Sequence, residues 1–117
     1  MIINLPVPPS VNALYANRKG GRGPGRYKTA TYKAWLANAD TYYLAQKRRV
    51  DPVSGPAIVT IRIPANTRGD VSNRIKAAED FLVSRGITND DRHNHKVSIE
   101  RDATVTCCVI EITARDA

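Results

Sequence analysis

Short apolar runs and alternating apolar and polar positions predict four β-strands. The runs cover residues 2–5, 57–63, 96–100 and 104–113. Proline follows the first two runs, at Pro6 and Pro64, and prevents their continuation. We expect the last two strands to form a hairpin that turns around Asp102-Ala103.

Apolar residues at helical spacing predict two helices. The first runs from about residue 29 to 48, and its core face consists of Tyr32, Trp35, Leu36, Ala39 and Tyr43. The second runs from about Asp70 to Arg85, and Gly86 occupies the position of a C-terminal cap. Its narrow apolar stripe, the expected core side, consists of Val71, Ile75, Ala78 and Leu82. The order β, α, β, α, β, β predicts a small single α+β domain over residues 1–117, with a mixed sheet of about four strands covered by two helices.

Composition is consistent with one globular domain. The chain has 117 residues, of which 42% are hydrophobic, enough for a modest core. No stretch approaches the roughly 20 apolar residues of a membrane span, and the start MIINLPVPPS has no signal-peptide pattern. Cys107 and Cys108 are adjacent within a predicted strand and point to opposite faces, so we expect reduced cysteines in a cytoplasmic protein.

The net charge of +7 is unevenly distributed. Residues 1–49 contain nine Lys or Arg residues and one acidic residue, Asp40, whereas the remainder contains nine basic and ten acidic residues. The excess positive charge therefore lies in the N-terminal half, including the glycine-rich stretch RKGGRGPGR at 18–26, which we expect to be a mobile basic loop. Such asymmetry indicates a polyanionic partner for that half.

A polar face of the second predicted helix carries candidate catalytic chemistry. It consists of Ser72, Asn73, Lys76, Glu79 and Asp80, with Asp70 at the helix start and Asn89-Asp90-Asp91 in the following turn. If Asp70, Asp90 and Asp91 converge, three carboxylates make a hard oxygen site suited to Mg²⁺. Such a metal can generate a hydroxide nucleophile next to a phosphate, and a nearby lysine can stabilise the added negative charge.

Simpler interpretations of the same residues stay open. Asp70 with Asn73 is a good N-terminal helix cap. Glu79 beside Lys76 is consistent with ordinary surface pairing, and Asn89-Asp90-Asp91 with turn chemistry. The sequence alone does not decide whether these carboxylates meet.

Three segments together resemble the RusA family of Holliday-junction resolvases. Residues 5–15, LPVPPSVNALY, are similar to the family's N-terminal signature LPxPPSxNxxY. Residues 70–76, DVSNRIK, resemble its second motif, an Asp-x-Asp-Asn stretch followed by a lysine. Residues 86–91, GITNDD, resemble its third, a glycine and then a pair of aspartates. The motifs occur in the family's order and span nearly the whole chain.

The resemblance implies a RusA-like fold and a homodimeric, Mg²⁺-dependent endodeoxyribonuclease, with Mn²⁺ as a substitute metal. Such enzymes cut branched double-stranded DNA at four-way junctions by paired symmetric nicks during recombination and repair, and many are carried by prophages. By position, Asp70, Lys76 and Asp91 match catalytic residues, and Asp70 and Asp91 match metal ligands, to which we add Asp90. The expected DNA-binding residues are Arg18, Lys19, Arg22, Arg26, Lys28, Lys47, Arg48, Arg49 and Asn73.

One position departs from the family pattern. The second aspartate of the Asp-x-Asp-Asn motif is Ser72 here, and a neutral hydroxyl is a weak ligand for Mg²⁺. The site is completed by Ser72 itself or by Glu79, Asp80 or Asp90. Otherwise the protein binds branched DNA and cuts it poorly. A catalytically weak or inactive branched-DNA binding protein is therefore the main alternative, and a basic architectural or RNA-binding module is a third. We favour a working site because the other motif residues are intact.

Overall fold

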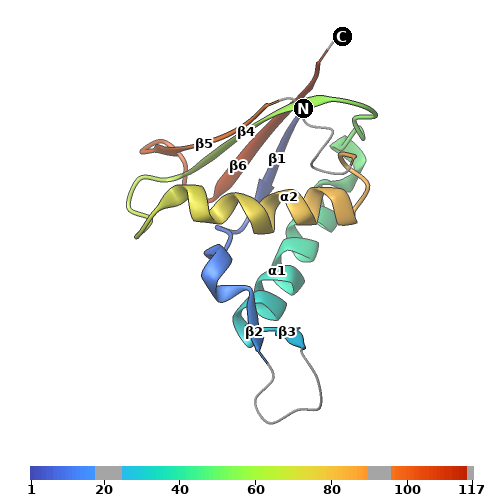
Figure 1. Ribbon diagram of the computed structural model, residues 1–117. Coiled ribbons are helices and arrows are strands. Elements are labelled where there is room, and N and C mark those ends of the chain that lie inside the picture. The colour runs from blue at the N-terminus through green and yellow to red at the C-terminus, as the bar shows by residue number, and fades with distance from the viewer. Residues whose placement is uncertain (18–24, 90–95, 116–117) are drawn as a thin grey trace.

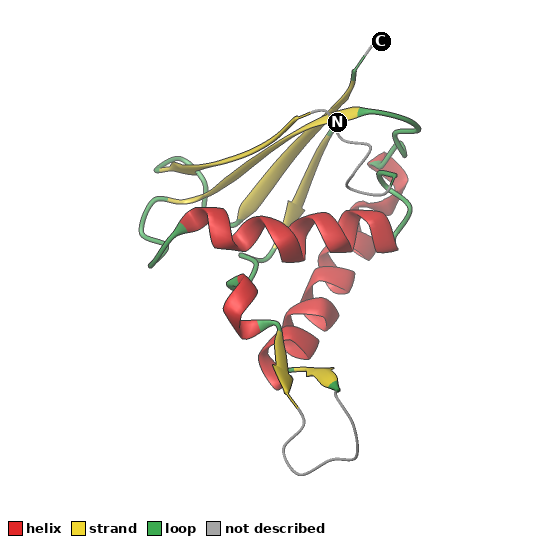
Figure 2. Cartoon of the chain, viewed as in Figure 1, coloured by secondary structure: helices red, strands yellow, loops and turns green. Residues whose placement is uncertain are grey.

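The computed structural model describes residues 1–17, 25–89 and 96–115, and Figures 1 and 2 show the arrangement of its elements. In chain order these are β1 (Ile2–Leu5), η1 (Val11–Ala13), β2 (Tyr15–Asn17), β3 (Arg26–Lys28), α1 (Ala30–Gln46), η2 (Lys47–Arg49), β4 (Ala57–Pro64), η3 (Val71–Arg74), α2 (Ile75–Ser84), β5 (Lys96–Asp102) and β6 (Cys108–Ala114). None of the helices in the described part of the chain has the length and apolar character needed to cross a bilayer.

A four-stranded mixed sheet forms one layer, with the strand order β1-β6-β4-β5. β4 pairs in parallel with β5 and antiparallel with β6, which in turn pairs antiparallel with β1. At the centre of the sheet, Val59 lies opposite Val97 on one side and Ile112 on the other. Together with the two α-helices this sheet confirms the predicted α+β fold with about four strands.

The predicted hairpin between the last two strands is wrong. β4 lies between β5 and β6, so these consecutive strands are not hydrogen-bonded to each other. The turn itself is present, because the Asp102 carboxylate accepts hydrogen bonds from the Thr104 amide at 2.8 Å and from its hydroxyl at 2.6 Å. The segment between the strands then spans two strand spacings, about 10 Å, before β6 begins. Alternation of apolar residues predicts which face a side chain occupies but not which strand is the neighbour.

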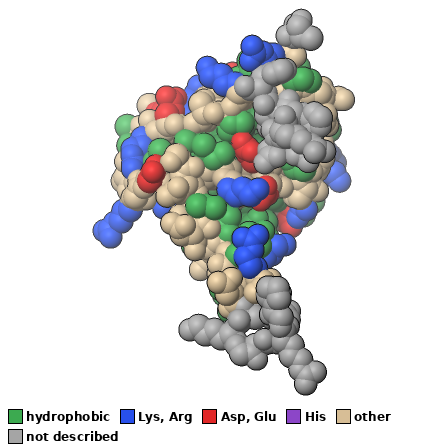
Figure 3. Space-filling model, in the orientation of Figure 1, with side chains coloured by type: hydrophobic (Ala, Val, Ile, Leu, Met, Phe, Trp, Pro, Cys, Tyr) green, Lys and Arg blue, Asp and Glu red, His purple; other side chains and the backbone are tan. Residues whose placement is uncertain are grey.

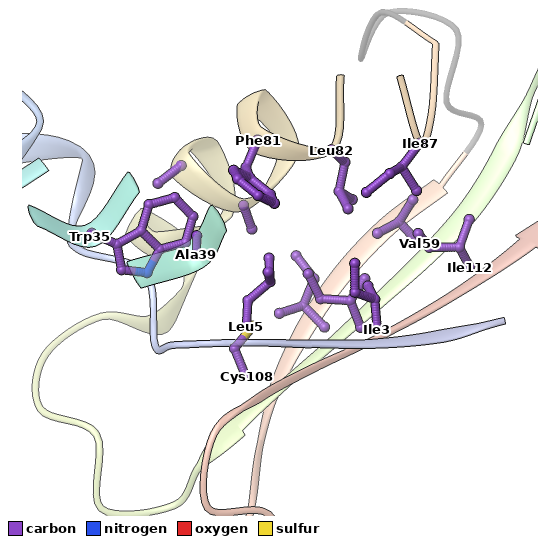
Figure 4. Close-up of a cluster of buried hydrophobic side chains, with 14 of the residues drawn as sticks. Ile3, Leu5, Trp35, Ala39, Val59, Phe81, Leu82, Ile87, Cys108 and Ile112 are labelled. Carbon is purple, nitrogen blue, oxygen red and sulfur yellow. The ribbon is translucent and has the colours of Figure 1, made fainter. Parts of the chain in front are cut away.

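Both helices lie on the same side of the sheet (Figure 1), and the core fills the space between the layers. Figure 4 shows Trp35 and Phe81 from the helices directed towards Leu5, Ile3 and Val59 on the strands. The predicted core face of the first helix is confirmed: Tyr32, Trp35 and Ala39 are buried, and Leu36 and Tyr43 pack against them. The Trp35 and Phe81 rings meet edge to face, with 5.8 Å between their centroids.

The second predicted helix consists of a 3₁₀ segment, η3, followed by the α-helix α2. Gly86 has a φ of 69°, which confirms it as the residue that ends the helix in a left-handed conformation. Ala78 and Leu82 are buried as predicted, and Val71 and Ile75 pack against the core, but Ala77 and Phe81 are buried as well. Ala77 and Phe81, four residues apart, form a second buried row beside Ala78 and Leu82, so the core side is wider than the predicted stripe.

Glu79 corrects the predicted polar face. This side chain was expected to be on the solvent side, but it is only 9% exposed. It follows directly after Ala77 and Ala78, which are fully buried, on the widened core side of α2.

A small second sheet projects away from the main one and was not predicted. It pairs β2 with β3, so that Tyr15 lies opposite Lys28 and Asn17 opposite Arg26. The predicted basic loop at 18–26 is therefore partly strand, because Arg26 belongs to β3, while residues 18–24 lie outside the described part of the chain. Strands of three residues are too short to give a clear alternating pattern.

Candidate active site

Asp70 is the N-terminal cap of η3. Its Oδ1 atom accepts a hydrogen bond from the Ser72 amide at 3.0 Å and another from the Ser72 hydroxyl at 2.8 Å. The Ser72 hydroxyl, then the Ser72 amide, and the nearby charge of Arg101 lower the pKa of the Asp70 carboxyl. The predicted capping role is confirmed, and the cap leaves an exposed, ionised carboxylate at the surface.

Two arginines hold the loop that presents Asp70. Arg101, near the end of β5, donates from Nη1 to the Thr67 carbonyl and from Nη2 to the Gly69 carbonyl, the latter at 2.6 Å. Gly69 has a φ of 82°, a backbone conformation that other residues rarely adopt. The loop therefore has a defined path from β4 to Asp70, fixed by a side chain from the neighbouring strand.

The second arginine, Arg74, joins this loop to the N-terminal proline-rich segment. Its Nη1 atom donates to the Pro8 carbonyl at 2.7 Å and its Nη2 atom to the Arg68 carbonyl at 3.0 Å. The segment itself is well packed, because Pro8 and Pro9 are buried and the Pro6 carbonyl accepts a 3.0 Å bond from the indole nitrogen of Trp35. Sequence reasoning missed both arginines, since their roles depend on contacts far along the chain.

Lys76 lies on the exposed side of α2. Its Nζ atom is 3.1 Å from Oδ1 of Asp80, an ion pair between residues four apart. Lys76 thus pairs with the acidic residue that follows Glu79, and Lys76 and Glu79 each have further interactions. The Lys76 side chain is half exposed in this pair.

The structure does not bring Glu79 or Asp80 to Asp70. Four residues of 3₁₀ helix and about five of α-helix separate them, a rise of about 15 Å along the axis. Across the described residues, no group of three or more His, Cys, Asp or Glu side chains is arranged to hold a metal ion. Ser72 does reach Asp70, but its hydroxyl donates to the carboxylate and keeps it ionised.

Asp90 and Asp91 lie outside the described residues. The chain that leads to them leaves α2 at the end opposite to Asp70, and Asn89 is exposed. The chain that follows them enters β5 at Lys96, opposite Ile58, whereas Arg101, which contacts the Asp70 loop, lies opposite Ile63.

The predicted DNA-binding residues fall into separate places. Arg26 and Lys28 belong to β3, and the Arg26 guanidinium lies 4.7 Å from the centre of the Tyr15 ring. Lys47, Arg48 and Arg49 form η2 at the other end of α1, about 25 Å away along its 17 residues. Asn73 is half-buried in η3, and Arg18, Lys19 and Arg22 lie outside the described residues.

The chemistry of Asp70 fits a divalent cation. A hard cation such as Mg²⁺ takes carboxylate oxygens and keeps several water ligands, so one ionised, exposed carboxylate is a suitable first ligand. The two hydrogen bonds from Ser72 go to the same oxygen, Oδ1. Among the described residues the site thus supplies one carboxylate and an adjacent hydroxyl.

Fold and site together define a small α+β protein with an ionised carboxylate at the start of η3 and basic clusters at the two ends of α1. The sequence profile of the family described as endodeoxyribonuclease RusA matches residues 6–114. The chain belongs to this family, whose members are endonucleases that resolve Holliday junctions with the help of a divalent metal ion. No curated protein matches the chain.

Proposed function

We propose that this endonuclease resolves four-way DNA junctions by paired symmetric nicks, in a reaction that requires Mg²⁺, with Mn²⁺ as a substitute. The observation that supports it most is the exposed Asp70 carboxylate, whose pKa is lowered by Ser72 and whose loop is held by Arg101. A ligand that stays ionised and fixed in position is what a hard metal ion requires. Family membership supplies the substrate class.

The metal ligands in this proposal are Asp70, Asp90 and Asp91. When bound, the metal supplies an activated water and neutralises charge on the scissile phosphate. Ser72 holds Asp70 in its ionised form. Its hydroxyl therefore offsets part of the metal affinity that a second aspartate would contribute. Arg101 and Arg74 orient the backbone from which Asp70 projects.

Lys76 is proposed to contact the phosphate directly. An ammonium group beside the scissile phosphate stabilises the negative charge that develops in the transition state. The ion pair with Asp80 limits the motion of Lys76. Asp80 thus has a supporting role, while the catalytic residues are Asp70, Lys76 and Asp91.

The basic clusters are proposed to bind the arms of the junction. Arg26 and Lys28 lie at one end of α1 and η2 at the other, so one chain offers positive charge at two places about 25 Å apart. Two copies related by a two-fold axis would present two equivalent sites to the two opposed strands, and paired nicks follow from that symmetry.

A specific observation favours the alternative of a branched-DNA binding protein with little activity. Ser72 stands where the family motif has an aspartate, and among the described residues neither Glu79 nor Asp80 replaces the missing charge near Asp70. If Asp90 and Asp91 do not complete the site, metal binding is weak and cleavage is slow.

Substitution of Asp70 distinguishes the proposed junction-cleaving enzyme from the alternative DNA-binding protein. We expect Asp70→Asn to reduce Mg²⁺-dependent cleavage of a four-way junction at least about a hundredfold, because a charged metal ligand is lost. Junction affinity without metal should stay equal or improve, since a negative charge near the phosphates is removed. Both quantities are measured with labelled junctions on gels.

Asp51→Asn is the matched control, because Asp51 is exposed and remote in the chain from the motif residues. Equal cleavage by the Asp70→Asn and wild-type proteins would contradict the proposal. Tight junction binding by the wild-type protein without cleavage in Mg²⁺ or Mn²⁺ would favour the binding protein.

A further inference from the structure

A pocket of about 280 Å³ lies between the β2–β3 hairpin, α1 and the C-terminal half of α2. All of its lining residues belong to the described part of the chain. It is separate from Asp70, which lies about 15 Å away along η3 and α2. Its volume is at the small end of the range of about 300–1,000 Å³ for ligand pockets, which suits a single flat ring system.

One wall of this pocket is built from tyrosine rings that are fixed by packing. The rings of Tyr15 and Tyr32 meet edge to face, with 5.7 Å between their centroids. Behind them, Trp35 stacks on Tyr32 at 6.3 Å and contacts Phe81 at 5.8 Å. Tyr32 is only 3% exposed, so a flat ring in the pocket would pack mainly against the half-buried Tyr15. Aromatic rings of this kind bind nucleobases, because every base has a π face.

Two cations line the same pocket. The Lys28 ammonium lies 5.9 Å from the centre of the Tyr32 ring. Arg85 lies over Phe81 at 5.1 Å, and its Nε atom donates to the Asp40 carboxylate at 2.6 Å, which fixes its position. Because Arg85 pairs with Asp40 through both Nε and Nη2, Lys28 supplies most of the positive charge that a phosphate attached to a base in the pocket would meet.

A carboxylate faces the same space. Asp80 lines the pocket and is paired through Oδ1 with Lys76. Figure 3 shows Lys and Arg side chains next to Asp and Glu side chains on the face that carries α2, with hydrophobic surface close by. An ionised carboxylate only accepts hydrogen bonds, so it favours a ring with an exocyclic amino group.

We propose that this pocket binds one unpaired nucleobase of the DNA, with its phosphate against Lys28 and Arg85 and its exocyclic amino group donating to Asp80. Adenine, cytosine and guanine each have an exocyclic amino group and thymine has none, so we expect the first three bases to be preferred over thymine. The inference rests on the proposed function, because the base comes from the DNA on which the enzyme acts. Lys76, paired with Asp80 and proposed to contact the scissile phosphate, connects the pocket with the cleavage site.

The test is titration of the full-length, ¹⁵N-labelled protein with dCMP, dAMP, dTMP and deoxyribose 5-phosphate, followed by NMR. We expect saturable shifts at the amides of Tyr15, Lys28, Asp80 and Ser84. dCMP and dAMP should bind about fivefold or more tightly than dTMP, because a hydrogen bond to a charged acceptor is lost with thymine. Deoxyribose 5-phosphate should bind about tenfold more weakly than dCMP, because stacking is lost.

A variant that fills the pocket gives an independent readout. Ser84 lines the pocket, is exposed and lies at the end of α2, so Ser84→Trp adds bulk there without disturbing the core. We expect it to weaken dCMP binding about tenfold, whereas Ala34→Trp, at an exposed position of α1, should bind like the wild type. Tyr15→Phe should retain binding and Tyr15→Leu should lose it, which covers the case in which Ser84→Trp does not fold.

Equal affinity for dCMP and deoxyribose 5-phosphate would overturn the inference. So would shifts confined to residues outside the pocket, or wild-type affinity in both Ser84→Trp and Tyr15→Leu. Junction cleavage measured on the same samples separates the two proposals. Cleavage without nucleotide binding overturns the pocket alone, and nucleotide binding without cleavage overturns the endonuclease mechanism alone.

Discussion

Ser72 determines the state of Asp70 more than it replaces a missing ligand. Its hydroxyl and amide both donate to Oδ1 of Asp70, and they lower the pKa of that carboxyl. A depressed carboxyl pKa stabilises the folded state above the unfolded pKa, and this contribution is lost as the pH falls through the lower folded value. Near neutral pH, Asp70 is therefore ionised and ready for a cation.

Restoring an aspartate at this position tests its role. We expect Ser72→Asp to lower the Mg²⁺ concentration for half-maximal junction cleavage about tenfold, because metal affinity rises with ligand charge. The second carboxylate also raises the pKa of Asp70 by like-charge repulsion, so the acidic limb of the pH–rate profile should move upward. Both are read from cleavage rates across Mg²⁺ and pH series.

Ser72→Asn is the control for this change, because it has similar size to aspartate but no charge. An unchanged Mg²⁺ requirement in Ser72→Asp, or an equal change in Ser72→Asn, would show that position 72 does not act on the metal.

Tyr32 provides a pH prediction that does not depend on the active site. Burial, then the nearby Tyr15 and Asp80, raise the pKa of Tyr32 to about 12. In the unfolded chain the phenol loses its proton near pH 10 while the folded protein keeps it, so the free energy of unfolding falls as the pH rises between these values. In Tyr32→Phe the melting temperature should decline less over this range.

Thermal melts of both proteins from pH 8 to 11.5 measure the difference, with Tyr42→Phe as the control because Tyr42 is exposed. Parallel declines in the melting temperatures of all three proteins would contradict the assignment of this pH dependence to Tyr32.

At the level of elements, Arg101 and Arg74 show how the site is assembled. Each guanidinium donates to two backbone carbonyls, and together they connect the β4–η3 loop with β5 and with the proline-rich segment. Such long-range contacts are not visible in a hydrophobic pattern. They also explain why the motif at 5–15 belongs to the same functional unit as Asp70.

We expect Arg101→Ala to reduce junction cleavage about tenfold to a hundredfold with little change in melting temperature. The loop that carries Asp70 loses two hydrogen bonds, and misplacement of a catalytic group by about 1 Å has an effect of this size. Arg115→Ala is the matched control, because it removes one exposed positive charge elsewhere. If both variants lose activity equally, Arg101 acts through charge and not by positioning Asp70.

Local patterns predicted the elements well and their partners less well. The helix faces of α1 and the alternation in β4 were confirmed, because burial on one face sets the period of a single element. The hairpin of β5 and β6 was wrong because insertion of β4 depends on contacts between distant segments. Glu79 is on the wrong face in the prediction, although it lies four residues after Ile75, which packs against the core, and therefore on the same side of α2.

The candidate site was predictable only where its signals are local in the sequence. Asp70 as a cap is a local signal, and the structure confirms it. The hydrogen bonds from Arg74 and Arg101, the pairing of Lys76 with Asp80, and the pocket beside Tyr15 need the tertiary fold. The roles of Asp90 and Asp91 stay predictions.

For the molecule as a whole, the strand edges of the main sheet limit where a second copy of the chain can pack. The outer edge of β1 is blocked, because the Gln46 side chain makes two 2.7 Å hydrogen bonds with the Asn4 backbone. Both edges of β4 are used within the sheet. We therefore do not expect a second copy to extend the sheet at β1.

The most direct test of junction resolution is to map nicks on a four-way junction labelled on each strand in turn. With Mg²⁺, we expect nicks at symmetry-related positions on two opposed strands, no cleavage of linear duplex of the same sequence, and no nicks with chelator. Nicks on one strand only, or equal cutting of linear duplex, would contradict the proposed resolvase.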